Sequence, residues 1–81
     1  MTLTELQPRT VAVIDAVQDQ GPNDTIARRL RELGFVAGEP VSVVAAGPFG
    51  AEPLLVQIGF TRFALRRAEA ARVRLRRAAA P

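Results

Sequence analysis

Apolar residues are dense early in the chain, where β-branched side chains prevail between Val11 and Val17. Pro8 lies before this run, and the sequence Gly-Pro-Asn-Asp at 21–24 ends it. Valine and isoleucine favour extended backbone, whereas glycine, proline and asparagine favour turns. The pattern therefore predicts a first strand over residues 11–17, followed by a loop.

After this loop the spacing of apolar residues changes to that of a helix. Apolar side chains recur at i, i+4 and i+7: Ile26, Leu30 and Leu33. This spacing places them on one face, so we expect a short amphipathic helix over residues 23–33 that buries this stripe. Asn23 or Asp24 can accept hydrogen bonds from the first turn, and Gly34 can take the left-handed conformation that ends a helix.

The rest of the chain predicts further short strands. They are expected at four places: from Val41 to Gly47, from Leu54 to Ile58, around Phe63 and Leu65, and around Val73 and Leu75. Residues 47–53 hold several glycines and prolines and are expected to form a loop. Residues 67–71 are expected to form a helical turn, and the alanine-rich end, about 76–81, is expected to fray.

Short strands with one short helix after the first indicate a mainly β fold. In so small a chain they are best closed as an SH3-like, partly open barrel. At 81 residues the chain can build one hydrophobic core, so residues 1–81 are expected to form a single domain. An OB-type barrel is the main alternative fold, and it would need longer strands than the sequence offers.

The composition excludes most catalytic chemistry, because the chain has no Cys and no His. Carboxylates such as Asp15, Asp19 and Asp24 remain as metal ligands, and their spacing matches neither an EF-hand nor a paired-carboxylate motif. We expect no catalytic residue, no cofactor, no metal site and no enzymatic activity; turnover lost on changing a single acidic residue would revive the enzyme alternative. The apolar runs are too short to span a membrane and no signal-peptide pattern begins the chain, so we expect a cytoplasmic protein.

All 11 basic residues are arginine, and charge is unevenly distributed along the chain. Residues 1–40 carry four arginines and six acidic residues, net −2, whereas residues 41–81 carry seven and two, net +5. An acidic partner is therefore favoured. Nucleic-acid binding through a C-terminal arginine face is an alternative function, although Tyr and Trp, which would stack on bases, are missing. Alternation with apolar residues would place several arginines of the densest basic region on that face: Arg62, Arg66, Arg67, Arg72, Arg74, Arg76 and Arg77.

A set of motifs in a fixed order resembles a known family. The motifs are Arg29–Phe35, Gly38, Val41–Val43, Gly47–Gly50, Pro53 with Leu54, Ala64–Arg67, and Glu69 with Ala70. In this order, between about Leu3 and Leu75, the chain resembles FeoA, the accessory protein of bacterial ferrous iron uptake. One departure is Arg9, which stands where the family usually has glycine, so we expect the turn after Pro8 to be built differently.

The resemblance implies an SH3-like barrel and a non-enzymatic role in the cytoplasm. The implied partner is FeoB, the membrane ferrous iron transporter that carries a guanine-nucleotide-binding domain. The same fold also occurs as a domain of iron-dependent repressors, but this chain lacks a DNA-binding portion, so a free-standing protein is the simpler interpretation.

Two surface features are candidates for contact with that partner. Arginines on the helix can pair with an acidic surface, or they can be solvated with local ion pairs to Asp24 and Glu32. Arg29 could act as an arginine finger, but no phosphate-transfer motif supports this. The predicted loop carries Phe49, whose ring is either an exposed anchor or a small satellite of the core. The candidate partner-binding residues are Arg28, Arg31, Pro48, Phe49, Pro53 and Leu54.

Overall fold

The computed structural model of the chain describes residues 1–49 and 52–76. Its elements follow in the order η1 (Leu3–Glu5, a 3-10 turn), β1 (Val11–Val17), α1 (Thr25–Leu33), β2 (Pro40–Phe49), β3 (Glu52–Ile58), β4 (Thr61–Leu65), α2 (Arg67–Ala70) and β5 (Val73–Leu75). The strands form one antiparallel sheet in the order β4-β3-β2-β1-β5. The predicted mainly β fold with one short helix after the first strand is confirmed, whereas η1 was not predicted.

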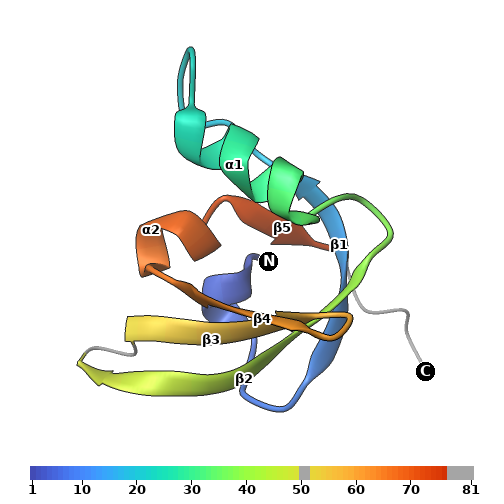
Figure 1. Ribbon diagram of the computed structural model, residues 1–81, viewed down its shortest axis with the longest axis vertical. Coiled ribbons are helices and arrows are strands. Elements are labelled where there is room, and N and C mark those ends of the chain that lie inside the picture. Colours follow the sequence, from blue (N-terminus) through green and yellow to red (C-terminus); the bar gives the residue numbers. More distant parts are fainter. Residues whose placement is uncertain (50–51, 77–81) are drawn as a thin grey trace.

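The sheet curves around its own core, as Figure 1 shows. β2, β3 and β4 form one side, β1 leads up the other side toward β5, and η1 lies inside the curve. Alternate residues of each strand point inward, so that Val41 and Val43 of β2 and Val56 of β3 are buried. Leu3 of η1 is also fully buried, and the N-terminal segment thereby belongs to the core.

α1 is capped at both ends as its sequence predicts. The Asp24 carboxylate accepts hydrogen bonds from two N–H groups of the first turn, at 3.1 Å each. Gly34 has a φ of 112°, a left-handed conformation that costs glycine little. The Phe35 N–H then donates to the Leu30 carbonyl, and the Phe35 ring is buried beneath the end of the helix. These caps fix where α1 begins and ends.

The face that α1 buries differs from the predicted stripe. Ala27 and Leu30 are buried, whereas Ile26 and Leu33 keep 37% and 38% of their surface exposed. The small side chain of Ala27 allows the helix to approach the core, which turns Ile26 and Leu33 to one flank of the helix. The prediction that all three apolar residues of the stripe face the core is therefore wrong for two of them.

The prediction of a loop over residues 47–53 is wrong for residues 47–49 and 52–53, which lie in strands, and residues 50–51 lie outside the described residues. β2 continues to Phe49 and β3 begins at Glu52, and these two residues pair with each other. The register shifts between Ala46 and Phe49, and such a bulge accommodates residues that interrupt regular strands. A Cβ atom on Gly47 would overlap the backbone of Glu52, so glycine permits the close approach of the two strands.

Two further segments are the turn before β1 and the C-terminal end. Arg9 has a φ of 66°, so an arginine occupies the left-handed conformation that glycine favours in the turn before β1. Of the end that was expected to fray, residues 77–81 lie outside the described residues. The N–H group of Arg76 donates to the Val13 carbonyl at 2.8 Å. Fraying of the C-terminal end stays a prediction.

Candidate functional site

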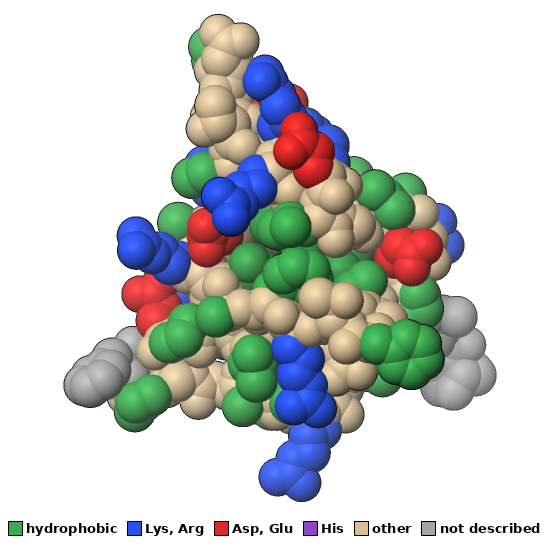
Figure 2. Space-filling view, viewed as in Figure 1, with side chains coloured by type: hydrophobic (Ala, Val, Ile, Leu, Met, Phe, Trp, Pro, Cys, Tyr) green, Lys and Arg blue, Asp and Glu red, His purple; other side chains and the backbone are tan. Residues whose placement is uncertain are grey.

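A groove between α1 and β4 has a cavity volume of about 850 Å³. We call it the α1–β4 groove. It is lined by Thr25, Ile26, Arg29, Leu30, Leu33, Pro53, Phe63, Ala64, Leu65, Arg66 and Glu69. Figure 2 shows hydrophobic side chains gathered below α1 in the centre of this face, with charged side chains of both signs around them.

The floor of the α1–β4 groove is apolar and well supported. Leu30 of α1 and Leu65 of β4 are buried, and half-buried Phe63 packs against the core. The ring of Phe63 lies 5.5 Å from the ring of Phe35, tilted by 55°, a favourable arrangement for two aromatic side chains. A floor held by core packing keeps its shape when a ligand binds.

The flank of α1 that the sequence predicted to be buried forms one wall of the groove. Ile26 and Leu33 lie two turns apart on this flank, with Arg29 between them. Their exposure therefore has a structural reason, because both side chains line an apolar hollow. A partially exposed stripe of this kind is typical of a surface that binds another protein.

Charged groups rim the end of the groove nearest α2. Arg66 precedes α2, and its N–H donates to the Glu69 carboxylate at 2.7 Å. Across the groove, Arg29 makes no ion pair within 4 Å among the described residues. An exposed guanidinium beside an apolar floor can receive a carboxylate from a partner.

An ion pair between two segments far apart in the sequence fixes the position of α1. The Nε atom of Arg72 lies 2.8 Å from Oδ2 of Asp24, and both side chains are largely shielded from solvent. The hydrogen bond from Arg72, helped by the backbone N–H groups of residues 20 and 27, holds the pKa of Asp24 well below its usual range. The pair ties the start of α1 to the residue before β5, and it thereby sets one wall of the groove.

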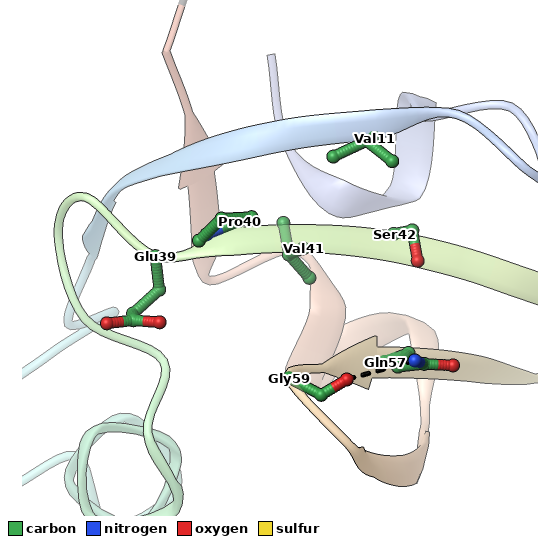
Figure 3. Close-up of a pocket in the computed structure, with 7 residues that line it drawn as sticks. All are labelled: Val11, Glu39, Pro40, Val41, Ser42, Gln57 and Gly59. Atoms are coloured by element: carbon green, nitrogen blue, oxygen red, sulfur yellow. Dashed lines mark hydrogen bonds between the residues drawn. The ribbon is translucent and has the colours of Figure 1, made fainter.

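A second, smaller hollow lies beside β1, β2 and the end of β3. Figure 3 shows the residues that line it: Val11, Glu39, Pro40, Val41, Ser42, Gln57 and Gly59. Its volume is about 270 Å³, and the Gln57 side chain donates to the Gly59 carbonyl at 2.9 Å beside it. A hollow of this size suits solvent or a single side chain better than a segment of a partner.

The structure does not bring the predicted partner-binding residues together. Among them, Pro53 lines the α1–β4 groove, and Arg28 is exposed on another side of α1. Arg31 is already engaged, because it donates to the Val17 carbonyl at 2.7 Å and lies 3.0 Å from a carboxylate oxygen of Asp19.

The other predicted positions lie on β2 and β3. Pro48 is exposed, and the side chain of Phe49 lies outside the described residues. Leu54 is buried in the core. The contact role of the whole set remains a prediction.

The arginine face proposed for nucleic acid is partly used for internal contacts. Arg72 is paired with Asp24, as described above, so its guanidinium is not free on an outward face. Arg74 donates to the Gln18 side chain, and Arg62 donates to the Gln57 side chain, both at 3.0 Å. These contacts leave fewer guanidinium groups free for phosphates than the sequence implied.

Sequence reasoning missed the groove and one prominent surface residue. The signal for the groove was present, because Ile26 and Leu33 bracket Arg29 at helical spacing, but burial was assumed for both. Phe60 is fully exposed at the tip of the β3–β4 turn, and nothing in the sequence distinguishes it from a core phenylalanine. Position in the fold, rather than residue type, decides which apolar residues are accessible.

Two further features of the described residues concern metal ligation and membrane crossing. Residues 1–49 and 52–76 contain no cluster of three or more acidic, His or Cys side chains arranged to hold a metal ion. Over the same ranges, no helix has the length and apolar character needed to cross a bilayer.

Comparison with known proteins identifies relatives over almost the whole chain. The FeoA domain family matches residues 1–77. No curated protein matches the chain. Among solved structures, FeoA from Stenotrophomonas maltophilia is 66% identical, with a TM-score of 0.88 over 94% of this chain and 89% of that one. That protein was solved with zinc and is described as a prokaryotic SH3-domain protein and a candidate activating factor of bacterial ferrous iron transport.

More distant relatives share the fold. FeoA from Chlorobium tepidum is 29% identical, with a TM-score of 0.78 over 93% of this chain and 68% of that one. Iron(II) transport protein A from Clostridium thermocellum is also 29% identical, with a TM-score of 0.79 over 93% of this chain and 44% of that one. The SH3-like fold expected from the sequence is confirmed.

Proposed function

The chain belongs to the FeoA family, and on that premise we propose that it is a non-enzymatic accessory protein of bacterial ferrous iron uptake. In this proposal it acts in the cytoplasm as one domain and binds the cytoplasmic part of a FeoB-like transporter. The contact surface in this proposal is the α1–β4 groove, in place of the predicted set formed by Arg28 and Arg31 with residues 48–54.

The observation that carries the proposal is the composition of the α1–β4 groove. Its floor is a continuous apolar surface, and Arg29 and Arg66 lie at its rim. Protein interfaces typically combine an apolar centre with a polar rim that includes arginine. The volume of about 850 Å³ is sufficient for several side chains of a partner.

Iron enters this proposal as the cargo of the transporter. The role assigned to the chain is to bind a protein, and it requires no metal ligand and no chemical step. This agrees with the description of the Stenotrophomonas maltophilia relative as a candidate activating factor of transport.

The test is calorimetric titration of the chain with the purified cytoplasmic part of the cognate transporter, at low and at high salt. We expect saturable binding that weakens moderately with salt, because the rim is charged and the floor is apolar. Nonspecific duplex DNA serves as the control. Equal or tighter binding to DNA, falling steeply with salt, would favour the nucleic-acid alternative and contradict the proposal.

A pair of variants locates the contact. Leu33→Gln removes an apolar side chain from the groove, and Val11→Gln makes the same change at an exposed residue on β1, outside the groove. We expect Leu33→Gln to weaken binding about tenfold, as loss of a buried interface leucine does. We expect Val11→Gln to bind like the wild type. Equal effects of the two changes would contradict the assignment of the groove.

A further inference from the structure

β4 is an edge strand that borders the α1–β4 groove. In the sheet order β4-β3-β2-β1-β5 it pairs with β3 on one side and with no strand on the other. Its residues Phe63, Ala64 and Leu65 line the groove opposite α1. The groove is therefore bounded by a helix on one wall and an open strand edge on the other.

The register of the hairpin shows which backbone groups the open edge presents. Ile58 pairs with Thr61 across the turn Gly59-Phe60, and Gly59 has a φ of 57°, as in a two-residue hairpin turn with glycine first. Such a turn is closed by a hydrogen-bonded pair, and the pairs of an antiparallel ladder then alternate. The N–H and C=O groups of Arg62 and Ala64 consequently point away from β3.

These outward groups have no internal partner in the described chain. None of the backbone hydrogen bonds outside the sheet ladder involves residue 62 or 64. The edge ends just beyond them, because the Arg66 N–H is satisfied by the Glu69 carboxylate and the Arg67 N–H by the Glu52 carboxylate, at 2.7 Å each. The open edge is thus short, and it lies where the groove is apolar.

We propose that the α1–β4 groove receives an extended segment of the protein partner, which adds to β4 as a further strand. The segment hydrogen-bonds to the outward groups of Arg62 and Ala64 and lies about 4.8 Å from β4. Alternate side chains of the segment then lie on the floor between β4 and the flank of α1 that carries Ile26 and Leu33. This inference rests on the proposed function, since the partner is the cytoplasmic part of the transporter.

Charge indicates the chemistry of the segment. Arg29 stands on the wall opposite β4 without an ion pair in the described structure, and the chain as a whole has a net charge of +3. Apolar residues at alternate positions and a carboxylate near Arg29 would complement the groove. A second copy of the chain fits less well, because edge-to-edge pairing of two β4 strands would bring two Arg62 side chains together.

The first test removes one outward N–H group without touching the β3–β4 ladder. Ala64→Pro deletes that donor, and a proline whose nitrogen faces away from the neighbouring strand is tolerated at a sheet edge. Ala64→Val keeps the donor and adds bulk, so it is the matched control. We expect Ala64→Pro to weaken binding of the cytoplasmic part of the transporter at least about tenfold, and Ala64→Val, which keeps the donor, to weaken it clearly less. Wild-type affinity of a folded Ala64→Pro variant would overturn the inference.

The second test uses the wild-type chain and does not depend on the folding of a variant. Amide hydrogen exchange is measured by NMR with and without the cytoplasmic part of the transporter. We expect the amides of Arg62 and Ala64 to exchange quickly in the free protein and to become protected in the complex, while those of Phe63 and Leu65 are protected in both. Binding without protection of Arg62 and Ala64 would overturn strand addition alone, whereas absence of binding would overturn the proposed function as well.

Discussion

The two edge strands of the sheet, β5 and β4, differ in whether another segment of the chain covers them. At the β5 edge the N-terminal segment covers the strand, because the Leu75 N–H donates to the Met1 carbonyl at 2.8 Å and Thr2 bridges to Arg74. At the β4 edge no segment of the described chain covers the backbone groups of Arg62 and Ala64 that point away from β3. An uncovered edge is an aggregation hazard unless it is short, charged or used for binding.

The difference shows which edge of the sheet is accessible to a partner. The closed edge is held by η1, whose Leu3 is fully buried, and by the pairing of Arg72 with Asp24 close to β5. The open edge faces the α1–β4 groove and has an apolar floor beside it. The closed β5 edge therefore contributes to stability, whereas the open β4 edge is available for binding a partner.

The largest effect is expected when the closed edge loses its anchor. Leu3→Ala removes a fully buried side chain from the core and should lower the free energy of unfolding by about 3 kcal/mol. Urea denaturation followed by circular dichroism measures this change. Leu33→Ala, at the groove wall, is the matched control and should cost less than about 1 kcal/mol. Equal losses for the two variants would show that the N-terminal segment is not a special anchor.

A smaller effect is expected from the ion pair that ties α1 to the closed side. Asn can still accept hydrogen bonds at the helix start, so Asp24→Asn removes the charge and keeps the cap. Because the pKa of Asp24 is lowered in the folded chain, its stabilising contribution is present above the unfolded value of about 4 and is lost as the pH falls below it. The melting temperature of the variant should be several degrees lower at neutral pH. As the pH falls below about 4, its melting temperature should decrease less than that of the wild type.

Thermal melts between neutral and acidic pH measure this effect. Asp19→Asn is the control, because the Asp19–Arg31 pair is solvent-exposed and such pairs add little to stability. If Asp24→Asn melted with the same pH dependence as the wild type, the pair would not be what holds α1 against the β5 side.

At the open edge, a charge reversal should alter binding and leave stability unchanged. Arg29→Glu places a negative charge beside the groove and should weaken binding of the transporter's cytoplasmic part roughly three- to tenfold at low salt, less at high salt. Arg74→Glu makes the same change in net charge at the closed edge and should weaken binding less. Titrations at two salt concentrations measure both. A larger effect of Arg74→Glu would show that the partner binds at the closed edge, which would contradict the account.

The smallest effect is expected at the tip of the hairpin that leads into the open edge. Phe60 is fully exposed and contributes no burial, so Phe60→Ser should change the free energy of unfolding by less than about 0.5 kcal/mol. Chemical denaturation measures the change. A loss of more than about 1 kcal/mol would show that the ring packs against the fold.

Much of this fold could be predicted because its elements are encoded locally. The caps at Asp24 and Gly34 and the β-branched run of β1 depend on neighbouring residues, and they were placed correctly. The rotation of α1 about its own axis was not predicted correctly, because it depends on how closely Ala27 approaches a sheet formed by distant segments. The long β2–β3 pairing was missed since Gly47 and Pro53 are typical of loops, and a bulge allows them in strands.

The candidate site was harder to predict than the fold for a related reason. A groove forms where two elements lie side by side, and here these are α1 and an edge strand more than 25 residues later in the chain. Arginines were correctly noticed on the helix, but sequence alone does not show that Arg31 contacts β1 while Arg29 borders a hollow. The ion pair between Asp24 and Arg72 likewise joins residues that no local pattern connects.

The central claim is that the partner binds at the open edge, and an NMR titration of the isotope-labelled chain with the cytoplasmic part of the transporter tests it most directly. We predict that backbone signals of α1 residues Ile26 to Leu33 and of β4 residues Arg62 to Leu65 shift on binding. Signals of β5 and of residues 1–3 should stay in place. Shifts confined to the β5 edge or to the β2–β3 turn, with the groove unchanged, would contradict the account.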